Sequence, residues 1–125
     1  MKNVLITGKN SYIGTSVENW LMKDNNRYKV DTIDMIDGSW KEEDFSAYDV
    51  VFHVAGIAHV KETKENRDLY YKVNRDLAFE TAKKAKEEGV KQFIFLSSMS
   101  VYGIDNGVIN EETSLNPKSN YGKSK

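Results

Sequence analysis

Short apolar runs alternate with amphipathic stretches along this chain, and the two periods predict strands and helices. The apolar runs at residues 4–6, 49–55 and 92–97 are typical of buried parallel strands, and the last two are apolar enough to be covered on both faces. Residues 29–34 alternate apolar and polar positions, which predicts a strand with one less buried face. We expect this strand at an edge of the sheet.

Two amphipathic helices are predicted from apolar residues at three- and four-residue steps. The first follows the first strand, fades near residues 24–26 and carries the apolar stripe Ile13, Val17, Trp20 and Leu21. The second is longer, stops near Gly89 and carries the stripe Tyr70, Val73, Leu77, Ala78, Ala82 and Ala85.

Strands that alternate with helices pair in parallel through right-handed crossovers. The predicted fold class is therefore α/β, a Rossmann-type three-layer parallel sheet abbreviated to about four strands in the order 2-1-3-4. Residues 1–125 form one domain in this interpretation. Only residues 35–48 join the second strand to the third, which leaves no room for a full helix-plus-strand unit. Residues 103–119 read as an irregular loop over the strand ends.

Composition excludes several classes of partner. Nineteen acidic and eighteen basic side chains give a formal charge of -1, so we expect no nucleic-acid or anionic-membrane partner. The absence of cysteine excludes disulfides, and no segment is apolar enough to span a bilayer, so the cytoplasm is the expected location. His59 has no partner at metal-ligand spacing, and we expect no metal site.

The loop from Gly8 to Gly14 lies between a strand and a helix start, where free amides and the helix dipole favour a pyrophosphate. Gly8 allows the turn and Gly14 lets the helix pack closely. Ser11 stands where a dinucleotide fingerprint has its middle glycine, so the match is imperfect. With the intervening Tyr12 and Ile13, these residues are the candidate phosphate-binding segment.

Asp34 ends the second predicted strand, where a carboxylate would accept the adenosine ribose hydroxyls. Its charge would repel a 2′-phosphate, which favours NAD over NADP, although Lys9 in the loop points the other way. The alternative for Asp34 is a turn residue, since Asp37 and Gly38 follow. Trp40 is open to two interpretations, stacking on the adenine or covering the core.

Tyr121 and Lys125 are spaced i, i+4 and would share one face of a helix, where the ammonium group favours tyrosinate. The pair follows the serine-rich segment 97–103, which ends the fourth strand at the carboxyl edge of the sheet. Ligands of open α/β sheets bind at this edge.

These motifs in this order resemble a known family. The Thr-Gly loop, Asp-Val-Val-Phe-His-Val-Ala-Gly, Ser-Ser-Met-Ser-Val-Tyr-Gly and Tyr-Gly-Lys-Ser-Lys are similar to the extended short-chain dehydrogenases/reductases, specifically the NAD-dependent epimerase/dehydratase family typified by UDP-glucose 4-epimerase. The resemblance covers essentially the whole chain and matches the N-terminal, NAD-binding portion of such an enzyme, without its substrate domain.

The resemblance implies roles for particular residues. Tyr121 would take the proton of a sugar hydroxyl while NAD takes the hydride, and Lys125 would hold the nicotinamide ribose and lower the pKa of the tyrosine. Ser98 would hydrogen-bond the reacting oxygen, with Ser100 as the alternative serine. Ala55 and Gly56 would bring backbone close to the cofactor. His53 and Asn74 match family positions with structural roles.

The resemblance also implies a nucleotide-sugar substrate, with a UDP-sugar expected, and a possible homodimer. Met99 and Ser100 stand where the family's 4,6-dehydratases have an Asp-Glu pair, so water elimination is not expected. We expect the 125 residues alone not to epimerise a sugar. Two other functions stay open: a non-catalytic NAD-binding module and an NAD(P)-dependent sugar reductase.

Overall fold

The computed structural model describes residues 1–58 and 61–125, which divide into two compact units. Unit 1 comprises Met1–Ala55 and Ala78–Leu96, and unit 2 comprises Gly56–Leu77 and Ser97–Lys125. Within the described residues no helix is long and apolar enough to cross a membrane.

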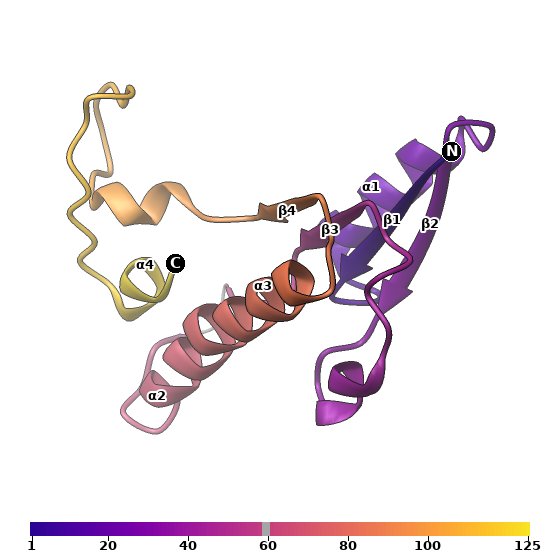
Figure 1. The fold of residues 1–125 in the computed structure, drawn as a ribbon. Helices are drawn as coiled ribbons and strands as arrows, with labels where there is room; N and C mark the ends of the chain where they lie inside the picture. Colours follow the sequence, from indigo (N-terminus) through magenta and orange to yellow (C-terminus); the bar gives the residue numbers. More distant parts are fainter. Residues whose placement is uncertain (59–60) are drawn as a thin grey trace. The chain divides into compact units, whose positions relative to one another are not determined.

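Unit 1 is built on a parallel sheet of four strands in the order β2-β1-β3-β4 (Figure 1). The strands are β1 (Lys2–Thr7), β2 (Tyr28–Ile33), β3 (Val50–His53) and β4 (Gln92–Phe95). This order and the parallel pairing confirm the predicted Rossmann-type sheet, with β2 at an edge.

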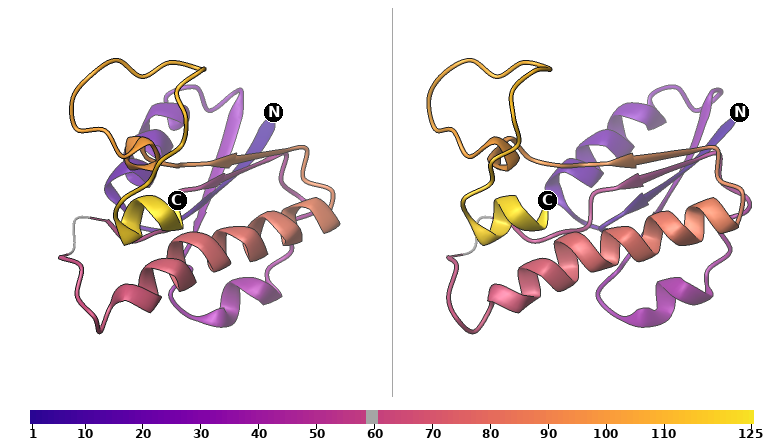
Figure 2. Two further views of the ribbon diagram at one scale, coloured as in Figure 1. Left: turned by 90° about the vertical axis from the view of Figure 1, so that its left-hand side faces the viewer. Right: turned by 60° about the vertical axis from the view of Figure 1, so that its left-hand side comes forward.

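Helices cover both faces of this sheet. Helices α1 (Tyr12–Met22) and α3 (Ala78–Glu87) lie on opposite sides of the strands (Figure 2). On the α1 side, Val4, Ile6 and Val50 form a buried cluster against which Val17 and Leu21 of the helix pack. Packing of Val17 and Leu21 holds α1 in place, because an isolated helix of eleven residues is marginal in water. Ile13 and Trp20 of the predicted stripe are instead 42% and 69% exposed, so only half of that stripe packs on the sheet.

The prediction that β4 is covered on both faces is wrong for unit 1. β3 is buried along most of its length, whereas Ile94 of β4 is 40% exposed. Helix α1 packs on β1 and β2, at the other end of the strand order, so it leaves the corresponding face of β4 uncovered within this unit.

A single short 3-10 helix, η1 (Gly38–Glu42), occupies the crossover from β2 to β3, as the short connection predicts. Trp40 and Phe45 of this crossover are buried, with 3% and 0% of their surfaces exposed. Trp40 therefore covers the core of unit 1, which decides against the alternative that it stacks on an adenine. Apolar anchors here replace the packing that a crossover helix would supply.

Polar contacts tie the same crossover to α3. Lys84 Nζ lies 2.6 Å from Glu88 Oε2 and donates to the carbonyl of Lys41 at 3.1 Å. The other carboxylate oxygen of Glu88 accepts from the amide of Phe45 at 2.8 Å. The ion pair thus satisfies two backbone groups that a 3-10 crossover leaves without helix partners.

The hydroxyl of Tyr48, at the end of the crossover, should lose its proton at a higher pH than an ordinary tyrosine. Its hydroxyl donates to Asp31 at 2.8 Å, and desolvation followed by the hydrogen bond and charge of Asp31 raises the pKa of Tyr48 to about 12. Because the unfolded phenol loses its proton near 10.0, the stabilisation is present below that pH and is lost between pH 10 and about 12.

An ultraviolet pH titration, with denaturant melts at each pH, tests this expectation. Tyr48→Phe should lack the latest-titrating tyrosinate and should show a flatter decline of unfolding free energy in that pH window. An unchanged titration curve in the variant would contradict the assignment.

The predicted long helix is present as three consecutive segments: α2 (Arg67–Tyr70), the π-helical segment η2 (Tyr71–Leu77) and α3. Gly89 follows with a φ of 83°, which confirms it as the stop residue. Asn74 and Thr81 continue the three- and four-residue spacing of Tyr70 and Ala78 and are buried, at 1% and 0% exposure, whereas the sequence pattern placed only apolar residues on the buried stripe.

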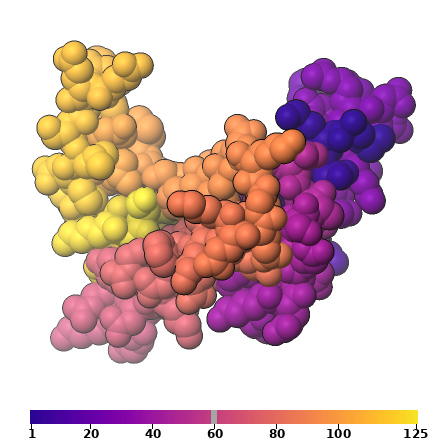
Figure 3. Space-filling model, viewed as in Figure 1, coloured from indigo at the N-terminus to yellow at the C-terminus, as the bar shows by residue number. Residues whose placement is uncertain are grey.

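The rest of unit 2 is mostly irregular. A 3-10 helix, η3 (Met99–Tyr102), is followed by a long loop and by the short helix α4 (Asn120–Ser124). The loop at residues 104–116 lies on the surface, and Val108 and Leu115 are 87% and 69% exposed (Figure 3). Glu111 and Glu112 are exposed as well.

Candidate functional site

The candidate residues fall into two sets, one in each unit. Gly8, the residues up to Gly14, Asp34 and Ala55 belong to unit 1. Gly56, Ser98, Tyr121 and Lys125 belong to unit 2. The geometry of each set is described within its own unit.

The glycine loop of unit 1 lies against the ends of β2 and β3, the two strands that flank β1. The amides of Gly8 and Lys9 both donate to the carbonyl of Ile33, at 3.0 and 3.1 Å, at the end of β2. On the other side, a Cβ on Gly8 would lie 3.2 Å from the amide nitrogen of Ala55, just after β3. Gly8 also has a φ of 84°, so both its conformation and its close approach require glycine.

Ser11 is the N-cap of α1, and its hydroxyl accepts from the amide of Gly14 at 3.1 Å. A Cβ on Gly14 would lie 2.6 Å from that oxygen and 3.3 Å from Ile6, so Gly14 is needed for the cap and for packing on β1. The Ser11 side chain therefore points back to the helix. This explains how the loop accommodates a serine at the position where a fingerprint has glycine.

Tyr12 and Ile13 supply the first turn of α1. Their side chains are 87% and 42% exposed, so they add no core packing at this end. Amides of a first helical turn have no acceptor inside the helix, and the dipole makes this end positive. Tyr12 and Ile13 thus offer backbone donors next to the glycine loop, which suits an anionic group.

Asp34 directly follows the residue whose carbonyl holds the glycine loop. Its Oδ1 atom accepts from the amide of Ile36 at 2.9 Å, which makes Asp34 a turn residue as the alternative interpretation expected. The side chain is exposed, and the turn uses Oδ1 and leaves Oδ2 as an acceptor. Turn formation and ribose recognition are therefore compatible.

In unit 2, Lys125 and Gly56 lie close together. A Cβ on Gly56 would be 3.0 Å from Lys125 Nζ and 2.8 Å from Asn74 Oδ1, so a larger residue here would require the Asn74 side chain to shift. Burial lowers the pKa of the Lys125 ammonium from its usual value. Lys125 is thus half-buried against the backbone at Gly56.

Asn74, for which the family resemblance implies a structural role, joins three segments of unit 2. Its side chain accepts from the amide of Ile57 at 2.8 Å and donates to the Ile57 carbonyl at 3.0 Å. The same amide group donates to Ser124 Oγ at 3.1 Å, one residue before Lys125. These hydrogen bonds and its burial agree with the structural role expected for Asn74 from the resemblance.

Tyr121 lies in the first turn of α4, whose N-cap Ser119 accepts from the amide of Gly122 at 2.9 Å. The Tyr121 ring packs edge-on against Tyr70, with 6.3 Å between ring centroids, and its amide donates to Glu62 at 3.2 Å. Lys125 follows four residues later at the C-cap. The helical spacing predicted for the pair is therefore present.

Ser98 is the N-cap of η3 and accepts from the amide of Ser100 at 3.1 Å. The segment that carries both serines packs against α4, because a Cβ on Gly122 would lie 2.6 Å from the Ser100 carbonyl oxygen. Unit 2 thus brings the two candidate serines to the helix of Tyr121. A hollow of about 400 Å³ adjoins them, lined by Met99, Ser100, Gly103, Ile104, Asp105, Lys118 and Ser119.

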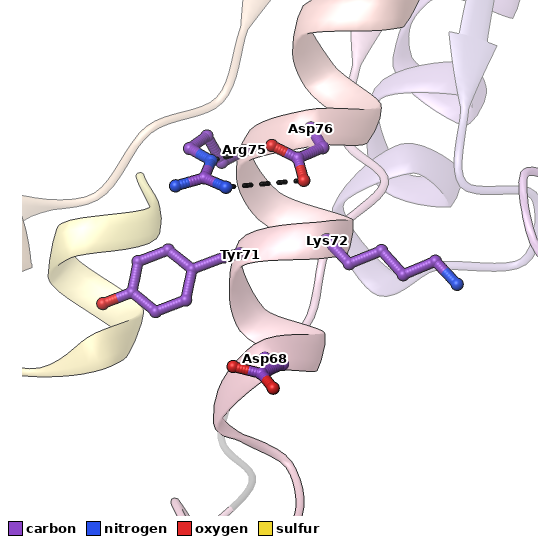
Figure 4. Close-up of a pocket in the computed structure, with 5 residues that line it drawn as sticks. All are labelled: Asp68, Tyr71, Lys72, Arg75 and Asp76. Atoms are coloured by element: carbon purple, nitrogen blue, oxygen red, sulfur yellow. Dashed lines mark hydrogen bonds and ion pairs between the residues drawn. The ribbon is translucent and has the colours of Figure 1, made fainter.

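A second hollow in unit 2, of about 410 Å³, lies along α2 and η2 and is lined by Asp68, Tyr71, Lys72, Arg75 and Asp76 (Figure 4). Arg75 pairs with Asp76 at 2.7 Å, and both side chains are largely exposed. None of the predicted site residues lines it.

No cluster of metal-ligating side chains occurs in residues 1–58 and 61–125. His59, to which the sequence analysis assigned no metal partner, lies outside the described residues.

Comparison with known proteins shows what this arrangement resembles. The chain is 31% identical to the UDP-glucose 4-epimerase of Vibrio cholerae over 99% of its length, and it spans 44% of that protein. It is 37% identical over 62% of its length to a protein of Bacillus subtilis described as an uncharacterized UDP-glucose epimerase, of which it spans 25%. The chain thus covers less than half the length of these relatives.

Solved structures agree. The UDP-glucuronic acid 4-epimerase of Bacillus cereus in complex with NAD matches with a TM-score of 0.80 and 25% identity over 98% of this chain and 48% of that one. MoeE5 in complex with UDP-glucose and NAD matches with a TM-score of 0.83 and 25% identity over 98% of this chain and 45% of that one. The model of the NAD dependent epimerase/dehydratase family matches residues 4–125. The chain therefore belongs to the NAD dependent epimerase/dehydratase family.

Proposed function

We propose that this chain is the NAD-binding and proton-transferring part of a nucleotide-sugar epimerase. The observation that carries the proposal is the position of the glycine loop at the ends of β2 and β3, with Asp34 directly after β2 and Ala55 two residues after β3. Membership of the family and the UDP-sugar epimerases among its relatives support the choice of reaction.

The residues of unit 1 fit a dinucleotide. The amides of Tyr12 and Ile13 hold the pyrophosphate, and the Oδ2 atom of Asp34 accepts from the adenosine ribose. Gly8 and Ala55 supply a wall of backbone without bulky side chains. A negative charge at Asp34 disfavours a 2′-phosphate, so NAD is the cofactor rather than NADP.

The residues of unit 2 transfer the proton of the sugar hydroxyl. NAD, when bound, supplies an acceptor for the hydride that leaves a sugar carbinol carbon. Tyr121 Oη takes the hydroxyl proton of that carbinol and returns it when the keto group is reduced again. Lys125 favours the tyrosinate by its charge and binds the nicotinamide ribose. Ser98 donates a hydrogen bond to the reacting oxygen.

An activity assay tests this proposal on the whole natural protein in which these residues occur. With NAD and UDP-glucose, we expect UDP-galactose to form without net production of reduced nicotinamide. Net oxidation of reduced nicotinamide with a keto sugar would instead identify a reductase. Saturable NAD binding without any sugar chemistry would identify a binding module. The 125 residues alone should not interconvert the sugars, because they span under half the length of the epimerases they match.

A further inference from the structure

Thr7 and His53 are paired residues at the carboxyl ends of the central strands β1 and β3, and both are fully buried. Thr7 Oγ1 lies 2.9 Å from His53 Nδ1. The same oxygen accepts from the amides of Val54 and Ala55, at 3.1 and 3.2 Å. One threonine hydroxyl therefore has three partners at the place where β3 ends.

The number of protons at this hydroxyl determines the direction of each hydrogen bond. A threonine hydroxyl has one proton to donate and two lone pairs that accept. Backbone amides only donate, so Val54 and Ala55 occupy both lone pairs. The hydroxyl proton must then go to His53 Nδ1, which accepts only while it carries no proton. A neutral His53 in this arrangement carries its proton on Nε2.

The opposite tautomer does not fit the same contacts. With a proton on His53 Nδ1, the hydroxyl oxygen would have to accept from three donors with two lone pairs. One part-buried amide, of Val54 or Ala55, would then lose its acceptor, which is unfavourable where access to water is reduced. The same conflict arises when the imidazole is doubly protonated.

Aromatic packing supports a fixed ring orientation. The His53 imidazole is stacked with Phe93, at 5.9 Å and an interplanar angle of 24°, and with Phe95, at 6.2 Å and 22°. Both phenylalanines belong to β4, next to β3 in the sheet. The ring plane is therefore held while Nδ1 faces Thr7.

The hydrogen bonds of Thr7 also position the backbone next to the glycine loop. The residue after Thr7 is Gly8, whose Cβ position lies 3.2 Å from the Ala55 nitrogen that Thr7 holds. We propose that Thr7 and His53 are positioning residues for the cofactor loop: His53, protonated on Nε2, orients the Thr7 hydroxyl, which fixes the backbone of Val54 and Ala55 against Gly8. The statement about the cofactor rests on the proposed function, whereas the proton arrangement does not.

The first test is nitrogen-15 NMR of the imidazole in the wild-type 125-residue chain at neutral pH, without any cofactor. Long-range nitrogen–proton correlations distinguish the two neutral tautomers and the cation. We expect His53 to carry its proton on Nε2. A proton on Nδ1, in the neutral ring or in the cation, would overturn the proposal.

The second test compares Thr7→Val with Thr7→Ser. Valine keeps the shape and removes the hydroxyl, whereas serine keeps the hydroxyl. In the valine variant we expect amide exchange at Val54 and Ala55 to accelerate by at least about fivefold, and NAD affinity to fall by a similar factor, as for the loss of about one net hydrogen bond. The serine variant should stay near wild type in both.

The outcomes separate the two proposals. If the wild-type chain does not bind NAD, the proposed function fails for this chain, while the tautomer and the amide exchange still decide the role of Thr7 and His53. Equal exchange at Ala55 in both variants would overturn that role. If the valine variant does not fold, the tautomer in the wild-type chain decides.

Discussion

Replacing Tyr121 with phenylalanine is expected to lower kcat for sugar interconversion by at least about 100-fold, the usual contribution of a positioned acid or base. The variant keeps the ring that packs edge-on against Tyr70 and removes only the hydroxyl. The amide contact to Glu62 is a backbone contact and is also kept. Binding of NAD should therefore be unchanged while the proton has no acceptor.

Steady-state assays of the whole natural protein, with calorimetric titration of NAD, measure the two effects separately. Tyr48→Phe is the matched control, because it removes a tyrosine hydroxyl from the β2–β3 crossover, where no proton transfer is proposed. The control should keep its rate. A Tyr121→Phe variant that interconverts sugars at the wild-type rate would remove Tyr121 from the mechanism and leave the binding-module alternative or another base.

Gly122→Ala is expected to destabilise the fold by about 1–3 kcal/mol, the usual cost of forcing an extra methyl group into a packed contact. Intrinsic propensity alone would favour alanine at a helical position by about 1 kcal/mol. The close contact outweighs this preference, so the substitution lowers the free energy of unfolding. The new methyl carbon would lie 2.6 Å from the carbonyl oxygen of Ser100 and 3.2 Å from its carbonyl carbon. These are backbone atoms, so η3 or α4 must move, and the activity should fall as well.

Denaturant unfolding of the 125-residue chain measures this effect. Gly38→Ala is the control, because a Cβ on Gly38 would have no heavy atom within 4 Å beyond the adjacent residues. That variant should be within about 0.5 kcal/mol of wild type, as for an ordinary surface substitution. A Gly122→Ala chain as stable as wild type would show that η3 and α4 do not pack as described.

The sheet could be predicted from the sequence because the patterns that identify its strands lie within short segments of the chain. Apolar runs and alternation identify the strands, and the right-handed crossover rule limits their order. The short connection between β2 and β3 likewise excluded a full helix-plus-strand unit. The sequence could not show whether Trp40 covers the core or stacks on a ligand. An aromatic residue in a short crossover is compatible with both, and only the packing distinguishes the two.

Other features depend on contacts between distant segments. Asn74 is buried because it forms hydrogen bonds with Ile57 and Ser124, and a search for apolar positions along one helix does not detect such partners. The contact of Thr7 with His53 requires the register of β1 and β3, which no local pattern contains. Ser11 was interpreted only as a departure from the glycine of the dinucleotide fingerprint, so its role as a helix cap was missed. Serine is nevertheless a preferred N-cap residue.

The central claim is that this chain binds NAD through the glycine loop and Asp34. The most direct measurement is a calorimetric titration of the 125-residue chain with NAD and, separately, with NADP, repeated for Asp34→Ala. Asp37→Ala is the control, because it removes a nearby exposed carboxylate that caps η1. We predict saturable NAD binding, weaker NADP binding, and an affinity for NAD that falls by about 10-fold or more in Asp34→Ala only, as for lost hydrogen bonds to a charged group. Absence of NAD binding by a chain shown to be folded, or equal affinity in the Asp34→Ala variant, would contradict the claim.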